Sequence, residues 1–107
     1  MLPKKNRVDK KTIKKIFQEG VFVNSPNLTL KFLKNKTGGK RISFIAPKSV
    51  ARLAIQRNLL RRLGYNALTK QMDKLPAGLV GVFIFKKNQK DLLILENEIK
   101  NILNKIN

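Results

Sequence analysis

The seven residues QRNLLRR, at positions 56–62, carry three arginines and an asparagine within about two helical turns. No acidic residue occurs between positions 48 and 62, whereas five cations do: Lys48, Arg52, Arg57, Arg61 and Arg62. Solvated helix faces normally mix the two signs of charge, because opposite charges one turn apart attract. Arginine also presents a planar fork of donors that fits a phosphate group. The run therefore predicts a surface that binds a phosphate backbone.

The arginines of this run share one side of a helical wheel. At about 100° per residue, apolar and cationic side chains fall on different sides. The apolar side holds Ile55, Leu59, Leu60, Leu63 and Ala67, and the cationic side holds Arg57, Asn58, Arg61 and Arg62. Gln56 and Leu68 break the partition. We expect an amphipathic helix whose apolar side packs on a sheet and whose cationic side faces outward.

The amide of Asn58 lies among these guanidinium groups. It can hydrogen-bond to a base edge or a ribose hydroxyl, and it can also order the neighbouring arginines. A plain surface amide is the third interpretation. The sequence leaves all three open.

Side chains that could catalyse hydrolysis are scarce in this chain. It has no His and no Cys, and its six carboxylates are scattered: Asp9, Glu19, Asp73, Asp91, Glu96 and Glu98. A two-metal nuclease site needs carboxylates that converge from several elements, and His is the commonest general base. We therefore expect no catalytic residues and no metal ion held by protein side chains alone.

Composition supports a polyanionic partner. The chain has 107 residues, which suits a single domain, and its 24 Lys and Arg against 6 Asp and Glu give a net charge of +18. A membrane surface is the rival polyanion, but no apolar run approaches the roughly 18 residues of a spanning helix. The N-terminus lacks the apolar stretch of a signal peptide. We expect a cytoplasmic protein that does not bind membranes.

Hydrophobic periodicity divides the first half of the chain. A helix is predicted over about 10–19, preceded by a basic arm over about 1–9. Residues 21–23 look extended, and residues 28–33 alternate as in a strand. A turn at 35–39 then leads to a return strand over 41–46, which makes a hairpin.

The second half begins with the amphipathic helix and continues past a loop at 75–78. Residues 79–85 (LVGVFIF) form a nearly continuous apolar run, typical of a strand buried on both faces. A final helix carries Leu95, Ile99, Ile102, Leu103 and Ile106 in one stripe. The order α-β-β-α-β-α predicts a small α/β domain, an α+β two-layer sandwich with a mostly antiparallel central sheet and three helices.

The run from Lys48 to Arg62, KSVARLAIQRNLLRR, resembles the signature of the protein subunit of bacterial ribonuclease P. In that family a basic loop precedes Arg-Asn-Arg, one apolar residue and Lys-Arg. Lys48 matches the first lysine of the loop, and the other matches are Arg57, Asn58, Arg61 and Arg62. Leu59 replaces the family's second arginine, and Ser49 replaces a usual second lysine.

The resemblance covers nearly the whole chain. LPKKNRVDKK is similar to the family's basic N-terminal stretch, IFQEG to the end of its first helix, and LPAGLVGVFIF to its Leu-Pro-x-Gly segment and following strand. The resemblance implies one ribonuclease P protein-like RNA-binding domain over 1–107 with a ribosomal protein S5 domain 2-like fold. It also implies a left-handed strand-helix-strand crossover.

The resemblance further implies the partners and the sites. The protein would bind the catalytic RNA subunit and the 5′ leader of precursor tRNA, while the RNA, with Mg²⁺, performs the hydrolysis. Contacts to the catalytic RNA would come from Lys48, Arg52, Arg57, Asn58, Arg61 and Arg62. The leader cleft would hold Ile13, Phe17 and Lys31, with an isoleucine and a lysine where the family often has aromatics. The basic arm would contribute Lys4, Lys5, Arg7, Lys10 and Lys11.

Other functions remain open from the residues alone. A ribosomal-protein-like module that binds ribosomal RNA without a processing role shares the charge, size and fold class. A small DNA-binding protein and an independent nuclease are further alternatives. Phe17, too, has a second interpretation, as a core aromatic under the sheet.

Overall fold

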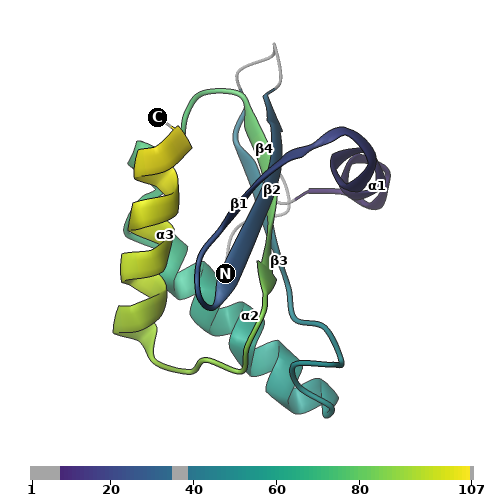
Figure 1. The fold of residues 1–107 in the computed structure, drawn as a ribbon, viewed down its shortest axis with the longest axis vertical. Coiled ribbons are helices and arrows are strands. Elements are labelled where there is room, and N and C mark those ends of the chain that lie inside the picture. Colours follow the sequence, from purple (N-terminus) through teal and green to yellow (C-terminus); the bar gives the residue numbers. More distant parts are fainter. Residues whose placement is uncertain (1–7, 35–38, 107) are drawn as a thin grey trace.

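The computed structural model describes residues 8–34 and 39–106, which contain three α-helices and four strands in the order α1, β1, β2, β3, α2, β4, α3 (Figure 1). The helices are α1 (Lys10–Glu19), α2 (Ala54–Thr69) and α3 (Leu92–Ile106), with a short 3-10 helix, η2 (Met72–Lys74), after α2. The strands are β1 (Val21–Asn24), β2 (Leu28–Lys34), β3 (Arg41–Ile45) and β4 (Leu79–Phe85). The predicted α+β fold is confirmed, and β1, expected only as an extended segment, is an added edge strand.

The four strands form one sheet in the order β1-β2-β4-β3. β1 pairs antiparallel with β2, β2 pairs antiparallel with β4, and β3 pairs parallel with β4, so the sheet is mostly antiparallel as predicted. The predicted hairpin between residues 28–33 and 41–46 is wrong, because β4 lies between these two strands. β4 is apolar at nearly every position, and only a central place in the sheet covers both of its faces.

The parallel pair β3 and β4 is joined through α2, which makes this connection a strand-helix-strand crossover. The left hand that the family resemblance implies for it stays a prediction.

The larger core lies where α2 and α3 cover one face of the sheet (Figure 1). Phe44 of β3 stacks on Phe83 of β4 with 5.0 Å between ring centroids, and Tyr65 of α2 meets Phe44 edge-on at 4.9 Å. Gly64 of α2 lets the helix approach this cluster, because an added Cβ atom would lie only 2.6 Å from Cε2 of Phe44. Aromatic packing thus sets the distance between α2 and the sheet.

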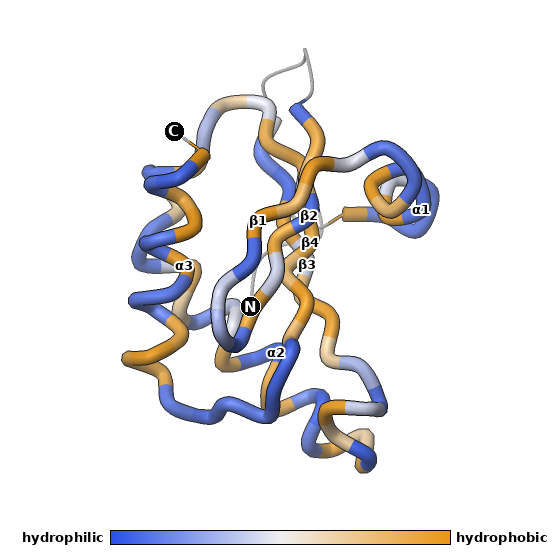
Figure 2. The backbone as a smooth tube through the Cα atoms, in the orientation of Figure 1, coloured by the Kyte–Doolittle hydropathy of each residue, from blue (hydrophilic) through white to orange (hydrophobic). Residues whose placement is uncertain are grey.

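Among the described residues, α1 and Val8 just before it cover the opposite face of the sheet (Figure 1). Ile16 of α1 is fully buried against Val80 and Val82 of β4, and Ile13 packs beside them. The outer side of α1 is hydrophilic, as the blue part of the tube shows (Figure 2). One short helix covers a sheet of four strands, so part of this sheet face stays accessible at β1 and β2.

Local contacts fix where α1 begins. The backbone N–H of Val8 donates to Oγ of Ser43 at 2.8 Å, which ties the end of the predicted arm to β3. Asp9 is the N-cap and accepts a hydrogen bond from the N–H of Thr12 at 2.8 Å. Hydrogen bonds from Thr12 lower the pKa of the Asp9 carboxyl. Residues 8 and 9 therefore belong to the folded domain.

The turn between β1 and β2 is tied to α3 by one carboxylate. Glu98 of α3 is buried and accepts hydrogen bonds from the hydroxyl of Ser25, the side-chain amide of Asn27 and, at 2.8 Å, the backbone N–H of Asn27. Burial raises the pKa of Glu98, but the hydrogen bonds outweigh burial and the net pKa is lowered. This carboxylate therefore holds the edge hairpin in place as an anion.

Candidate nucleic-acid interface

The first turns of α2 extend past the end of the sheet (Figure 1). In the second half of the helix, Gly64 and Leu68 are buried against the sheet. Arg57 and Arg61 lie on the same stripe of α2, because steps of three and four residues keep side chains on one face. These two arginines are half-buried. The stripe that forms the core in one half of the helix is cationic in the other.

The predicted apolar side of α2 is therefore wrong in its first half. Ile55 is 75% exposed and Leu59 is 39% exposed, whereas Leu68, which did not fit the wheel, is fully buried. The wheel compared side chains along the helix but could not show which turns have the sheet beneath them. Ile55 and Leu59 form an apolar strip on the outer side of α2, next to Arg62.

Two of the predicted phosphate-binding residues are held by specific contacts. The Nη1 group of Arg57 donates to the carbonyl oxygens of Ala51, at 3.1 Å, and Arg52, at 2.7 Å. Arg61 donates through Nη2 to the Oδ1 atom of Asn58. Asn58 therefore orders an arginine, as one of its three interpretations predicted. Both guanidinium groups keep further N–H donors for a ligand.

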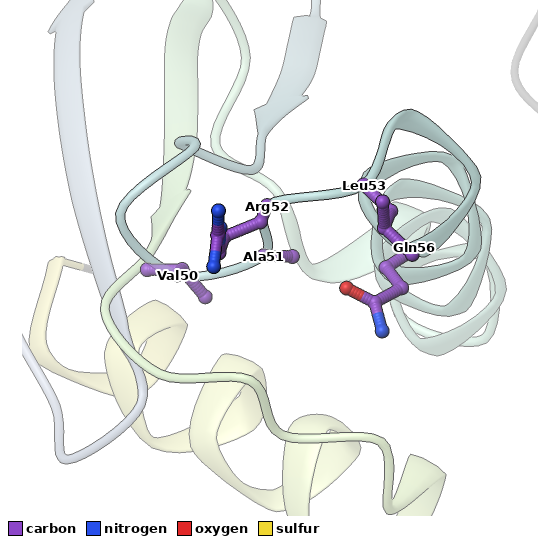
Figure 3. A pocket seen from close by; sticks show the side chains of 5 residues that line it. All are labelled: Val50, Ala51, Arg52, Leu53 and Gln56. Carbon is purple, nitrogen blue, oxygen red and sulfur yellow. The ribbon is translucent and has the colours of Figure 1, made fainter.

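The loop between β3 and α2 completes this basic surface, which we call the α2 cationic surface (Lys48, Arg52, Arg57, Asn58, Arg61 and Arg62). Lys48, Arg52, Asn58 and Arg62 are exposed. A pocket of about 570 Å³ lies between the loop and the first turn of α2 (Figure 3), lined by Val50, Ala51, Arg52, Leu53 and Gln56. In this view the amide oxygen of Gln56 points toward the loop. Cationic, amide and apolar groups thus meet at one place.

The predicted leader residues lie where α1 meets the sheet. Lys31 of β2 places its Nζ atom 5.0 Å from the centroid of the Phe17 ring of α1. Phe17 is 43% exposed, so its alternative interpretation as a core aromatic does not hold. Ile13 is partly buried and packs with the small core under α1. Of the three residues, Phe17 and Lys31 face solvent together, and Ile13 supports the helix.

Two further residues at this place were missed by the sequence analysis. Phe22 of β1 is 58% exposed and is the register partner of Lys31. Lys14 of α1 is exposed and lies one turn before Phe17. The sequence did show an aromatic residue in the short extended run VFV, which was the available signal for Phe22. The sequence did not show which strand this run would pair with. We call Phe17, Phe22 and Lys31 the junction surface.

The predicted basic arm is only partly within the described residues. Lys10 and Lys11 are exposed in the first turn of α1. Lys4, Lys5 and Arg7 lie outside the described residues. The arm therefore leads directly into the helix that carries Phe17.

The acidic side chains do not assemble into a catalytic or metal-binding group. Across residues 8–34 and 39–106, no three of His, Cys, Asp and Glu lie together in a way that could hold a metal ion. Lys70 and Glu96 form an ion pair at 2.8 Å. Nor is any helix in this part of the chain both long and apolar enough to cross a bilayer.

A small, basic α+β domain with a cationic helix end and exposed aromatics beside lysine has the features of a nucleic-acid-binding protein. The family model for ribonuclease P matches residues 2–107, nearly the whole chain. The chain therefore belongs to the ribonuclease P protein family. It is a protein component of ribonuclease P, the RNA-based endoribonuclease that matures the 5′ end of tRNA. Family membership sets aside the ribosomal, DNA-binding and independent-nuclease alternatives.

Solved structures show the same fold. The RNase P protein from Thermotoga maritima has a TM-score of 0.84 and 21% sequence identity, over 94% of this chain and 97% of that one. The RNase P protein from Staphylococcus aureus has a TM-score of 0.81 and 17% identity, over 94% of each chain. A search of the curated proteins found no match.

Proposed function

We propose that the α2 cationic surface docks on the catalytic RNA subunit. The observation that carries this proposal is that the acid-free run 48–62 covers the loop before α2 and the first half of that helix, where Lys48, Arg52 and Arg62 are exposed and Arg57 and Arg61 are half-buried. Arg57 also bonds to the carbonyls of residues 51 and 52, which holds the basic loop against the helix. A fixed array of guanidinium groups loses little entropy when it meets phosphates.

The junction surface, in this proposal, binds the single-stranded 5′ leader of precursor tRNA. Phe17 offers an exposed ring for a base, and Lys31 offers a cation for the backbone. Lys10 and Lys14 line the same side of α1 as Phe17 and add charge along the path. Ile13 contributes by packing α1 onto the sheet.

The protein's part in the reaction is then positional. Two RNA-binding surfaces on one rigid domain hold the leader relative to the catalytic RNA, which turns a weak encounter into an oriented one. The RNA subunit supplies the Mg²⁺ ions and the hydrolysis. Because precursor tRNA is transcribed in the bacterial cytoplasm, we place the complex there.

The test is the affinity of the reconstituted enzyme for precursor tRNA and for mature tRNA, with and without this protein, on a bacterial catalytic RNA. The protein should tighten binding of the precursor more than binding of the mature product, because only the precursor has a leader. Equal tightening of both would refute the leader role. Docking on the catalytic RNA would be refuted if the protein bound that RNA no better than an equally long RNA of scrambled sequence.

A further inference from the structure

The junction surface contains a second aromatic ring that the family resemblance does not point to. Phe22 lies on β1, the edge strand of the sheet, and is 58% exposed. It is paired with Lys31 in the antiparallel register of β1 and β2. Directly opposed residues in such a pair project from the same face, with Cβ atoms about 5 Å apart. Phe22 and Lys31 are therefore neighbours on the face that α1 covers only in part.

Lys31 lies between two aromatic rings, Phe17 and Phe22, which differ in whether a ring face is already in contact with another group. Its ammonium group lies over the ring of Phe17, 5.0 Å from the centroid, so one face of that ring already has a cation on it. Within the described part of the chain, the ring of Phe22 makes no stacking or cation contact. Phe22 is thus the more open of the two platforms.

The charges around this surface indicate what would cover Phe22. Lys31 lies beside it, and Lys10 and Lys14 line the adjacent side of α1. Exposed aromatic rings interleaved with cations favour single-stranded nucleic acid, since bases stack on the rings while the cations contact phosphates. An apolar protein partner would leave these lysines without matching acids.

We propose that Phe22 stacks a base of single-stranded RNA and that Lys31, between the two rings, contacts the phosphate beside it. This assignment rests on the proposed leader-binding role and extends the leader path from α1 across β2 to the edge of the sheet. The ring of Phe22 thereby supplies the base stacking that Ile13 and Lys31, which are not aromatic, cannot supply.

The first test uses the fact that the chain has no tryptophan. Phe22→Trp introduces a single indole at the proposed platform, and its fluorescence is followed while a single-stranded RNA oligonucleotide is added to the full-length protein. Stacking should quench the indole with the normal oligonucleotide and leave it nearly unchanged with an abasic one of equal length and charge. The same response to both oligonucleotides would overturn the proposal.

The second test compares Phe22→Leu with Val21→Ala in the reconstituted enzyme. Val21 is the matched control, because it is 61% exposed on the same strand but is paired with Phe32 on the opposite face. Loss of one stacked base should weaken precursor binding by roughly 5- to 150-fold in Phe22→Leu, and Val21→Ala should leave it unchanged.

The outcomes separate this inference from the proposed function. If Phe17→Ala reduces the preference for precursor tRNA and Phe22→Leu does not, the leader role stands and the assignment of Phe22 is wrong. If neither variant changes that preference, the leader role itself fails. Self-association that disappears in Phe22→Leu, with RNA affinity unchanged, would overturn the proposal in favour of pairing between two copies at the edge strand.

Discussion

The Nζ atom of Lys31 lies 5.0 Å from the centroid of the Phe17 ring, so a cation of β2 and an aromatic of α1 meet across the junction between helix and sheet. The two residues belong to different secondary-structure elements, and the fold brings them together on a solvent-facing surface. Cation–π contacts of this exposed kind contribute about 0.5–1 kcal/mol. Such a contact is weak enough for a ligand to replace.

Phe17→Ala should weaken binding of precursor tRNA by the reconstituted enzyme more than binding of mature tRNA. The reason is that the exposed ring is proposed to stack a leader base, worth about 1–3 kcal/mol. Titration of the two labelled tRNAs against the enzyme measures both affinities. An equal loss for both would indicate damage to the fold and not to leader recognition.

Arg61→Ala should lower the affinity for the catalytic RNA and reduce the salt dependence of binding. Each phosphate contact changes the slope of log K against log salt by roughly 0.7–0.9. Arg57→Ala should cost more, because Arg57 also holds the loop at residues 51 and 52. Binding is measured over a series of salt concentrations.

The matched control for these arginines is Lys100→Ala, which removes one exposed cation from α3. Its effect on the salt slope should be smaller than that of Arg61→Ala. The docking role would be contradicted by equal slopes for Arg61→Ala, Lys100→Ala and the parent protein.

Much of the fold follows from the sequence because its signals are local. The helix predicted over 10–19 is α1 with the same bounds, and the predicted strand 79–85 is β4. The neighbours of a strand are set by contacts distant in sequence, so the insertion of β4 beside β2 was not predicted. Ile55 illustrates the same limit for the site: periodicity placed it on a packed side, but only the fold shows that the sheet ends before it.

Glu98→Gln should destabilise the domain by roughly 1–3 kcal/mol near neutral pH, since a buried anion with several donors is replaced by an amide. The pKa of Glu98 is lowered in the fold, so its stabilising contribution is complete above the ordinary glutamate pKa. It is lost as the pH falls through the lowered pKa. Urea unfolding at several pH values should show the difference between variant and parent shrinking in acid.

Glu96→Gln is the control for that experiment, because the Glu96 carboxylate forms an ion pair with the exposed Lys70, and the substitution leaves the bond from Gln71 to the Glu96 backbone carbonyl in place. Loss of such a pair costs less than about 1 kcal/mol. A similar, pH-independent loss in both variants would show that the hydrogen bonds of Glu98 do not act as described.

Gly64→Ala should lower the free energy of unfolding by about 1–3 kcal/mol, although alanine favours a helix more than glycine does. The added methyl would collide with the buried ring of Phe44 and push α2 from the sheet. Gly39→Ala has no atom within 4 Å of the new Cβ and should be nearly neutral. Thermal unfolding of both variants makes the comparison, and an equally stable Gly64→Ala would refute this account of the packing.

The most direct test of the account is cleavage of precursor tRNA by a bacterial catalytic RNA at low Mg²⁺, with and without this protein. We predict strong stimulation by the protein, no cleavage by the protein alone, and weaker stimulation by the Arg57→Ala and Arg61→Ala variants. Tight RNA binding without any stimulation, on several bacterial catalytic RNAs, would contradict the claim that these two surfaces orient the substrate on the catalytic RNA.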